Sequence, residues 1–342
     1  MKIAIHKRID SYSERWVEYC EKNNISYKLV NAYSSDIIAE VDDCDVFMWN
    51  HAQHLHKDAL TAKNVIFSLE HAGITVFPNF KTTWHFDDKV AQKYLLEAIK
   101  APMVASYVFY DEIEALNWLK EQKYPVVFKL KRGAGSSNVR LLHSFKESKS
   151  VVKRAFKNGF EPFKESRLTL LNYRIKNFKD GQGNFLGLLK AFYRFVFPKF
   201  GQLGELHQRE KGYVYFQDFI PNNLFDIRVV VVGNKAFALK RLVRENDFRA
   251  SGSGKIVYDK NQIDLRCIKI AFEINNKLET QSIAYDFVFD KDNNPLIIEI
   301  SYGYSISAYD YCEGFWDENL NWHNEKVTPQ HWIIEDLIKS LK

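Results

Sequence analysis

The stretch AYDFVFDKDNNPLIIEIS, residues 284–301, places one carboxylate inside each of two apolar runs. Val, Ile and Phe alternate along both halves, and KDNNP between them supplies turn residues, so the pattern predicts a β-hairpin. If Asp290 faces Pro295 at the turn, counting back along both strands places Asp286 opposite Glu299 on the same face. The hairpin would therefore bring two acids together.

Two facing carboxylates need a positive group between them, because like charges directly opposite each other are destabilising. Their Cβ atoms would lie roughly 4.5–5.5 Å apart. Hard oxygen ligands at that separation suit Mg²⁺, which binds few carboxylates together with substrate phosphates. Ser301, two residues beyond Glu299, faces the same way. The alternative is an edge hairpin whose acids face water, as most acids do.

The composition is that of an ordinary soluble protein. The chain has 342 residues, of which 46% are hydrophobic and 27% charged, enough for two or three domains with a sizeable core. The chain begins directly with a strand pattern and contains no run of about 18 apolar residues. We therefore expect a cytoplasmic protein without a membrane span. The four cysteines show no CxxC spacing, which predicts reduced thiols.

Strand and helix signals alternate over the first eighty residues, which predicts an α/β unit with a parallel sheet. A helical stretch then leads into a strand, a small-residue loop and a second strand, and the pattern is strand-rich from FDIRVVVVG onward. We expect three parts: an α/β domain over 1–84, a small subdomain over 85–215, and a C-terminal catalytic subdomain over 216–342.

Residues 146–201 differ in character, with thirteen Lys or Arg against four acids, interleaved with Phe and Tyr. This basic, aromatic segment is interpreted as an insertion. It suits a structural cap on the sheet, a clamp for an acidic glycan or nucleotide-sugar, or a patch that meets an anionic membrane. The aromatic residues are spread along the segment, which favours the clamp over the membrane patch. No compact RNA-binding motif is present, so a nucleic-acid partner is not expected.

The loop KRGAGSSN, residues 131–138, follows a strand that carries Lys129. Its small residues would let backbone N–H groups approach phosphate oxygens. It is neither a Walker loop nor a G-x-G-x-x-G dinucleotide motif. A flexible hairpin loop is the alternative, but a lysine within an apolar strand is costly without an anionic partner, which favours phosphate binding.

Two further segments suit a nucleotide and its reaction. QDFIP ends a strand whose backbone could bond an adenine edge, and Asp226 follows it within reach of a ribose hydroxyl. Arg241, Arg244 and Arg249 precede a second glycine-rich loop, and such a group suits an anionic substrate or a transferring phosphoryl group. An exposed basic loop is the alternative.

Taken in order, these pieces resemble the ATP-grasp superfamily, in particular its ribosomal-protein-S6-modification-like and glutathione-synthetase-like members. The motifs DDK, VVFKL, the glycine-rich loop, YFQDFI, DIRVVVVG, DFRASGSG and the final hairpin cover roughly residues 85–302. More narrowly, HFDDKVAQKYLLEAI, NDFRASGSG and EISYGY resemble ATP-grasp proteins associated with bacterial surface-polysaccharide synthesis. The resemblance implies an α/β (α+β) class, with an ATP-grasp fold preceded by a small Rossmann-like α/β domain.

The resemblance also implies a nucleotide site, a metal site and two arginines at the acyl-phosphate region. Residues 217–220 would hold adenine and Asp226 the ribose, while Arg228 and Arg249 would face the acyl phosphate. The family usually has Asn where this chain has Ser301, which puts the second metal position in question. The residues implied to bind ATP are Lys89, Lys129, Gly133, Ala134, Gly135, Ser136, Ser137, Gln217, Asp218, Phe219, Ile220 and Asp226, and those implied to bind Mg²⁺ are Asp286, Glu299 and Ser301.

The activity implied by the resemblance is an ATP-dependent carboxylate–amine ligase. ATP would phosphorylate a carboxylate, and an amine would attack the acyl phosphate to form an amide, chiefly through positioning and charge neutralisation. Small carboxylates and amines derived from sugars or amino acids are the expected substrates. A kinase-like ATP-grasp protein and a degenerate nucleotide-binding or scaffold protein are the alternatives. The histidines of HAQHLH, with His6 and His85, are interpreted as surface or satisfied residues.

Overall fold

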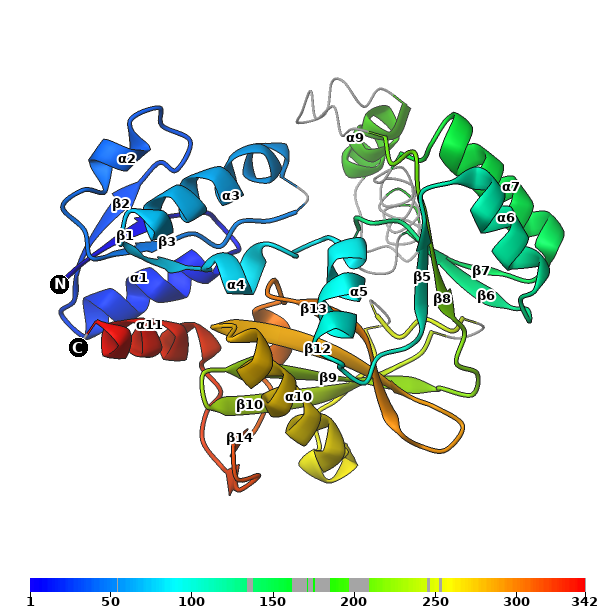
Figure 1. The fold of residues 1–342 in the computed structure, drawn as a ribbon. Coiled ribbons are helices and arrows are strands. Elements are labelled where there is room, and N and C mark those ends of the chain that lie inside the picture. Colours follow the sequence, from blue (N-terminus) through cyan, green and yellow to red (C-terminus); the bar gives the residue numbers. More distant parts are fainter. Residues whose placement is uncertain are drawn as a thin grey trace. The chain divides into compact units, whose positions relative to one another are not determined.

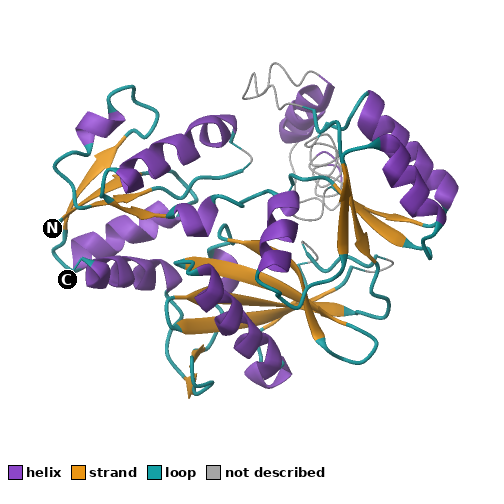
Figure 2. Cartoon of the chain, in the orientation of Figure 1, coloured by secondary structure: helices purple, strands orange, loops and turns teal. Residues whose placement is uncertain are grey.

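The computed structural model is a mixed α/β fold built on three sheets (Figures 1 and 2). It describes residues 1–53, 55–133, 138–161, 171, 175, 185–196, 209–244, 247–251 and 254–341. The chain forms two compact units: residues 105–219 form unit 2, and residues 1–104 with 220–342 form unit 1. Ala134, Gly135, Ser136 and Ser137 of the predicted phosphate loop lie outside the described residues.

Unit 1 begins with a four-stranded sheet in the order β2-β1-β3-β4, in which every ladder is parallel. The predicted parallel α/β unit is confirmed. Ser11 caps the first helix by accepting a hydrogen bond from Ser13 N, and Trp16 and Cys20 on that helix are buried. The elements are β1 (Lys2–His6), α1 (Tyr12–Lys22), β2 (Ser26–Val30), α2 (Ile37–Glu40), β3 (Val46–Met48), α3 (His56–His71), β4 (Thr75–Phe77) and α4 (Phe80–Thr83).

The helix α5 (Lys89–Ala98) links this sheet to the next one. The Asp88 carboxylate accepts a hydrogen bond from Ala91 N and so starts the helix at Lys89. Leu96 lies in the same apolar core as Ile297 and Ile300 of the second sheet. For this reason α5 belongs to unit 1, whose first segment ends at Val104, whereas the sequence predicts a first domain that ends at residue 84.

The second sheet has the order β13-β12-β9-β10-β14-β15, with β11 on the β10 strand. Alternation along β9 directs Val229 and Val231 toward α10 and Val230 and Val232 toward the opposite face. The elements are β9 (Phe225–Val232), β10 (Lys235–Leu242), β11 (Ile256–Val257), η1 (Lys260–Gln262), α10 (Leu265–Leu278), β12 (Ser282–Phe289), β13 (Pro295–Ser301), η2 (Ser307–Tyr309), β14 (Phe315–Asp317), β15 (Trp322–His323) and α11 (Pro329–Ser340).

The hairpin of β12 and β13 confirms that Asp286 pairs with Glu299. The predicted pairing of Asp290 with Pro295 is wrong, because Phe289 pairs with Pro295 instead. A β-bulge next to Asp286 inserts one extra residue in β13 and restores the expected pairing of the acids. Asp290 instead organises the turn by accepting hydrogen bonds from the backbone of Asp292 and Asn294.

Unit 2 contains an antiparallel sheet in the order β5-β8-β6-β7. Phe128 and Phe216 lie in a core with Leu119 of one helix and Val152 of another, so this face of the sheet is covered. The elements are β5 (Ser106–Phe109), α6 (Glu112–Lys120), β6 (Val126–Lys129), β7 (Val139–Leu142), α7 (Phe145–Lys157), α9 (Phe185–Val196) and β8 (Val214–Asp218). The two strands predicted around residues 126–142 are confirmed.

All four cysteines, Cys20, Cys44, Cys267 and Cys312, are buried and free, as the sequence predicts. Within the described ranges, none of the helices has the length and apolar character needed to cross a membrane.

Candidate functional site

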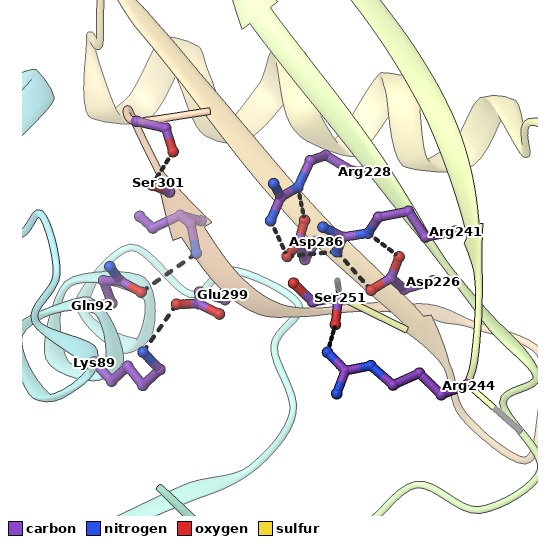
Figure 3. A network of polar contacts seen from close by, with 12 residues as sticks. Lys89, Gln92, Asp226, Arg228, Arg241, Arg244, Ser251, Asp286, Glu299 and Ser301 are labelled. Carbon is purple, nitrogen blue, oxygen red and sulfur yellow. Dashed lines mark hydrogen bonds and ion pairs between the residues drawn. The ribbon is translucent and has the colours of Figure 1, made fainter. Parts of the chain in front are cut away.

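Charged side chains from four neighbouring strands gather on one face of the second sheet (Figure 3). The register pairs Asp226 on β9 with Arg241 on β10, and Arg228 on β9 with Asp286 on β12. Asp286 is paired in turn with Glu299 on β13. Residues directly opposite across a ladder share a face, so backbone pairing alone gathers these acids and cations into one row.

Two arginines hold the Asp286 carboxylate, which is 3% exposed. Arg228 donates two hydrogen bonds to it, at 2.5 and 2.6 Å, and Arg241 Nη2 lies 2.8 Å from Oδ2. Burial raises the pKa of Asp286, but the two guanidinium groups outweigh burial and hold that pKa well below its usual value. Asp286 is therefore charged at neutral pH, and cations of the protein itself neutralise it.

Asp226 was predicted to bind a ribose hydroxyl, and the structure gives it a different partner. Both of its oxygens accept hydrogen bonds from Arg241, each at 2.6 Å, and the residue is buried. A bidentate carboxylate–guanidinium pair fixes the orientation of the arginine. Asp226 therefore positions Arg241 against Asp286, and its contact with a ribose hydroxyl stays a proposal.

Glu299 is paired with Lys89, the first residue of α5. The two charged groups are 3.0 Å apart, with Lys89 6% and Glu299 34% exposed. Burial lowers the pKa of Lys89, but the carboxylates of Glu299 and Asp87 outweigh it and raise that pKa above its usual value. One turn further on, Gln92 accepts a hydrogen bond from Ile300 N at 3.4 Å, which fastens α5 to β13 (Figure 3).

The oxygen donors near this row fit Mg²⁺ in their chemistry. The Glu299 side chain is about one-third exposed. Ser301 donates its hydroxyl proton to Gly303 O, which leaves the lone pairs of the Ser301 oxygen for a metal. Mg²⁺ needs only one or two protein carboxylates besides phosphates and water. The described residues contain no group of three or more His, Cys, Asp or Glu able to hold a metal. Both oxygens of Asp286 already contact Arg228 or Arg241, so a metal held by Asp286, Glu299 and Ser301 and shared with a phosphate stays a proposal.

The arginines predicted to face the acyl phosphate both have carboxylate partners in the structure. Arg228 is committed to Asp286, and the guanidinium of Arg249 lies 2.7 Å from Asp247. Arg244 donates to the backbone oxygen of Ser251 at 2.7 Å (Figure 3). Their placement at the acyl-phosphate region stays a proposal.

The predicted nucleotide residues of unit 2 lie on its small sheet. Lys129 and Gln217 alternate with core residues of β6 and β8, so they share the face opposite that core. Lys129 is buried, and Gln217 donates to Ser106 Oγ at 3.0 Å. Asp218 ends β8, while Phe219 and Ile220 stand at the boundary between the two units.

Gly133 opens the glycine-rich loop with a φ of +124°, a conformation that L side chains rarely adopt. A Cβ at this position would lie 2.3 Å from the Asn138 side chain, whose amide donates to Arg132 O. Only glycine fits here, so the base of the predicted phosphate loop is fixed in a specific shape.

Of the histidines interpreted as surface or satisfied residues, His6, His51 and His85 are buried, and His56 is partly exposed. His51 bonds Thr83 Oγ1 at 2.8 Å, and His6 Nδ1 accepts a hydrogen bond from Ala32 N. Burial lowers the pKa of His51 to about 3 and, with the nearby Lys63, that of His85 to about 4. His54 lies outside the described residues.

The sequence reasoning missed two residues of the site, Arg241 as a buried counter-ion and Gln92 as a fastener of α5. A signal for Arg241 was present. Arg241 lies two residues after Leu239, so both side chains point to the same, buried face of the strand. A buried cation needs an acidic partner. Gln92 has no comparable signal, because glutamines on helices are usually solvated.

Comparison with known proteins agrees with this architecture. Residues 203–310 match the RimK-like ATP-grasp domain. Alpha-aminoadipate–LysW ligase LysX of Saccharolobus solfataricus is 20% identical over 294 residues, 82% of this chain and 85% of that protein.

Two solved structures show the same fold. The biotin carboxylase domain of 2-oxoglutarate carboxylase from Hydrogenobacter thermophilus, solved with MgADP, has a TM-score of 0.58 and 14% identity over 98% of this chain and 69% of that one. The ATP-grasp ligase PsnB, solved with a minimal precursor, has a TM-score of 0.57 and 12% identity over 100% of this chain and 99% of that one. The chain therefore has the ATP-grasp fold. The match of residues 203–310 and the shared fold agree with the resemblance to the ATP-grasp superfamily that the sequence motifs predict.

Proposed function

We propose that the protein is an ATP-dependent carboxylate–amine ligase that works through an acyl phosphate. The observation that carries the proposal is the charge row on the second sheet, where Asp286 and Glu299 face each other and each is held by a basic side chain. Phosphoryl transfer is catalysed chiefly by positioning and charge neutralisation, and such a preorganised polar face serves both.

The row carries no net formal charge, because three carboxylates meet three cations. A site built for ATP needs additional positive charge, which Mg²⁺ would supply by neutralising phosphate charge. Glu299, Ser301 and Asp286 would hold that ion. The members of the row are Asp226, Asp286 and Glu299 with Lys89, Arg228 and Arg241.

The chain's own residues have distinct tasks in this proposal. Arg228 and Arg241 keep Asp286 ionised and fixed, while Asp226 fixes Arg241. Lys89 and Lys129 supply ammonium groups for the ATP phosphates, and the loop that begins at Gly133 supplies backbone N–H groups. Residues 217–220 bond adenine through their backbone.

The reaction balances without a further reactant. A carboxylate oxygen attacks the γ-phosphorus, ADP leaves, and an acyl phosphate forms. The amine then attacks the carbonyl carbon, phosphate leaves, and the amine loses one proton. The carboxylate and amine proposed here are small amino-acid or sugar derivatives. The name of LysX, which includes an amino acid, supports the first class. A role in surface-polysaccharide synthesis rests on the sequence resemblance.

An isotope experiment tests the acyl phosphate directly. Candidate carboxylates labelled with ¹⁸O are incubated with ATP, Mg²⁺ and an amine, and the released phosphate is analysed by mass spectrometry. A ligase transfers one ¹⁸O atom to phosphate for each amide formed. A stable phosphorylated product without free phosphate would indicate a kinase instead, and no turnover with any carboxylate would indicate a scaffold.

A matched pair of variants ties the result to the proposed site. Glu299→Gln removes a carboxylate of the row and should reduce turnover by at least about a hundredfold, as the loss of a charge-stabilising group does. Glu273→Gln removes an exposed acid of α10, 57% exposed, and should leave turnover unchanged. Equal activity of both variants would exclude the charge row as the catalytic site.

A further inference from the structure

The helix α9 of unit 2 exposes an apolar face. Five of its large side chains are between 46% and 69% exposed. Their spacing of three, three, one and three residues places them on one side of an α-helix, within an arc of about 120° at 3.6 residues per turn. These residues, called the α9 face below, are Leu186, Leu189, Phe192, Tyr193 and Val196.

This arrangement is the reverse of that in the other amphipathic helices. In α7, Val151, Val152 and Ala155 are buried, and in α10 Ile268 and Ala271 are buried. Large contiguous apolar surfaces are uncommon on soluble proteins and mark sites of interaction. The aromatic residues of the insertion were expected to be spread out, but α9 gathers Phe192 and Tyr193 on one side.

The charge of unit 2 identifies the kind of partner. Residues 105–219 contain 21 Lys or Arg and 11 Asp or Glu, a net charge of +10, whereas the remainder of the chain carries −5. Part of this charge is exposed on α7, which presents a series of cations to solvent, and Lys190 is exposed on α9 itself. The exposed cations of α7 are Lys146, Lys149, Lys153, Arg154 and Lys157.

We propose that unit 2 docks on an anionic lipid surface through the α9 face. An exposed apolar helix face on a strongly basic unit matches a membrane interface, where side chains enter the acyl boundary and cations meet the lipid headgroups. At 12 residues α9 is about 18 Å long, so it would lie along the surface and not cross it. A second copy of the chain is a poorer partner, because it would bring another unit of charge +10 against the first.

Vesicle co-sedimentation with the full chain tests the proposal. The protein should bind vesicles of phosphatidylcholine with 30% phosphatidylglycerol at least about tenfold more tightly than phosphatidylcholine alone, since each cation near an anionic surface contributes to binding. Raising NaCl from 0.1 to 0.5 M should weaken binding several-fold, because salt screens exposed charge. Binding that ignores both lipid charge and salt would overturn the proposal.

A fluorescent probe locates the contact. The four native cysteines are buried, so Phe192→Cys provides a single reactive thiol for an environment-sensitive dye. Anionic vesicles should shift its emission to the blue. The same dye on Ile113→Cys, a position of α6 that is 70% exposed, should not respond. An equal response at both positions would exclude docking through α9.

Paired variants give the final check. Leu186→Ser with Phe192→Ser should reduce vesicle binding about tenfold or more, whereas Ile113→Ser should not, although Ile113 is as exposed as Leu186. Loss of a concentration-dependent dimer in the double variant, with vesicle binding unchanged, would show that the α9 face joins two copies instead. None of these measurements depends on ligase activity, so they stand apart from the proposed reaction.

Discussion

The ammonium group of Lys89 lies 3.0 Å from the carboxylate of Glu299, although 210 positions separate the two residues in the chain. The pair connects the first turn of α5 to β13, and Lys89 neutralises Glu299, one of the two acids in the hairpin. Asp286, the other acid, is neutralised by Arg228 and Arg241. The charges that the hairpin brings together are thus balanced before any ligand binds.

Replacing Lys89 should cost stability. Lys89→Gln leaves Glu299 without its counter-ion, and a lost hydrogen bond to a charged group costs about 1.5–3 kcal/mol. Lys93→Gln, one turn along α5, removes a pair with Glu97 and a cation–π contact with Tyr94 on the same helix, and should cost about 1 kcal/mol or less. Urea unfolding of both variants measures the difference, and equal costs would contradict the structural role of the Lys89 pair.

Asp286→Asn should be more damaging than Glu299→Gln. Removing the buried carboxylate leaves Arg228 and Arg241 facing each other without their shared acid, and breaking a buried pair costs about 3–5 kcal/mol. Glu299 is one-third exposed, so water compensates for much of its loss. Both variants should lose turnover, but only Asp286→Asn should lower the unfolding midpoint strongly. A small stability effect of Asp286→Asn would contradict the burial of its ion pairs.

Ser301→Asn should keep or raise the Mg²⁺-dependent turnover. An amide oxygen is a hard ligand like the hydroxyl it replaces, and water completes the remaining coordination. Ser301→Ala removes the donor and should raise the Mg²⁺ concentration needed for half-maximal turnover. Titration of Mg²⁺ against initial rate distinguishes the two variants. An inactive Ser301→Asn enzyme would show that the serine has a separate role.

Lys129→Ala should weaken ATP binding by at least about tenfold, because a charged hydrogen bond in a partly desolvated site is lost. Lys120→Ala, at the end of α6, is the control and should bind ATP normally. Calorimetric titration with a non-hydrolysable ATP analogue measures both. Unchanged affinity of Lys129→Ala would exclude the small sheet of unit 2 as the phosphate site.

The buried histidines should make the fold sensitive to acid. Burial lowers the pKa of His85 to about 4, so below its ordinary value of 6.5 the unfolded chain binds a proton that the folded chain does not. Stability is therefore lost as pH falls from about 6.5 toward 4. Between pH 7 and pH 5, the free energy of unfolding of His85→Gln should fall by about 1–2 kcal/mol less than that of the parent. His143→Gln, at an exposed position, should follow the parent, and an unaltered slope in His85→Gln would contradict the prediction.

Much of the fold could be predicted from local patterns. The parallel sheet, a helix in the stretch before Pro102 and the pairing of Asp286 with Glu299 follow from periodicity and turn residues. The bulge beside Asp286 could not, because one extra residue in a strand leaves the alternating pattern almost unchanged. The ion pairs of Asp286 could not be predicted either. Arg228 and Arg241 lie on other strands of the sheet, and no local sequence pattern determines the order of those strands.

The end of the first segment of unit 1 at Val104 could not be predicted from local patterns, because it depends on the packing of Leu96 with residues about 200 positions later. The exposed α9 face was missed for a related reason. Spacing shows that a helix is amphipathic, but not whether its apolar side is covered.

The discontinuous make-up of unit 1 bears on the order in which the protein is synthesised. One core contains Ile3 and Trp16 from the start of the chain together with Phe237 and Trp332 from its end. A ribosome adding about 5–20 residues per second needs roughly 10–50 s to pass from residue 104 to Trp332. Throughout that interval the first sheet must keep an apolar face uncovered while residues 105–219 emerge and fold. We therefore expect the protein to need a chaperone most during this period of synthesis, at its nascent N-terminal segment.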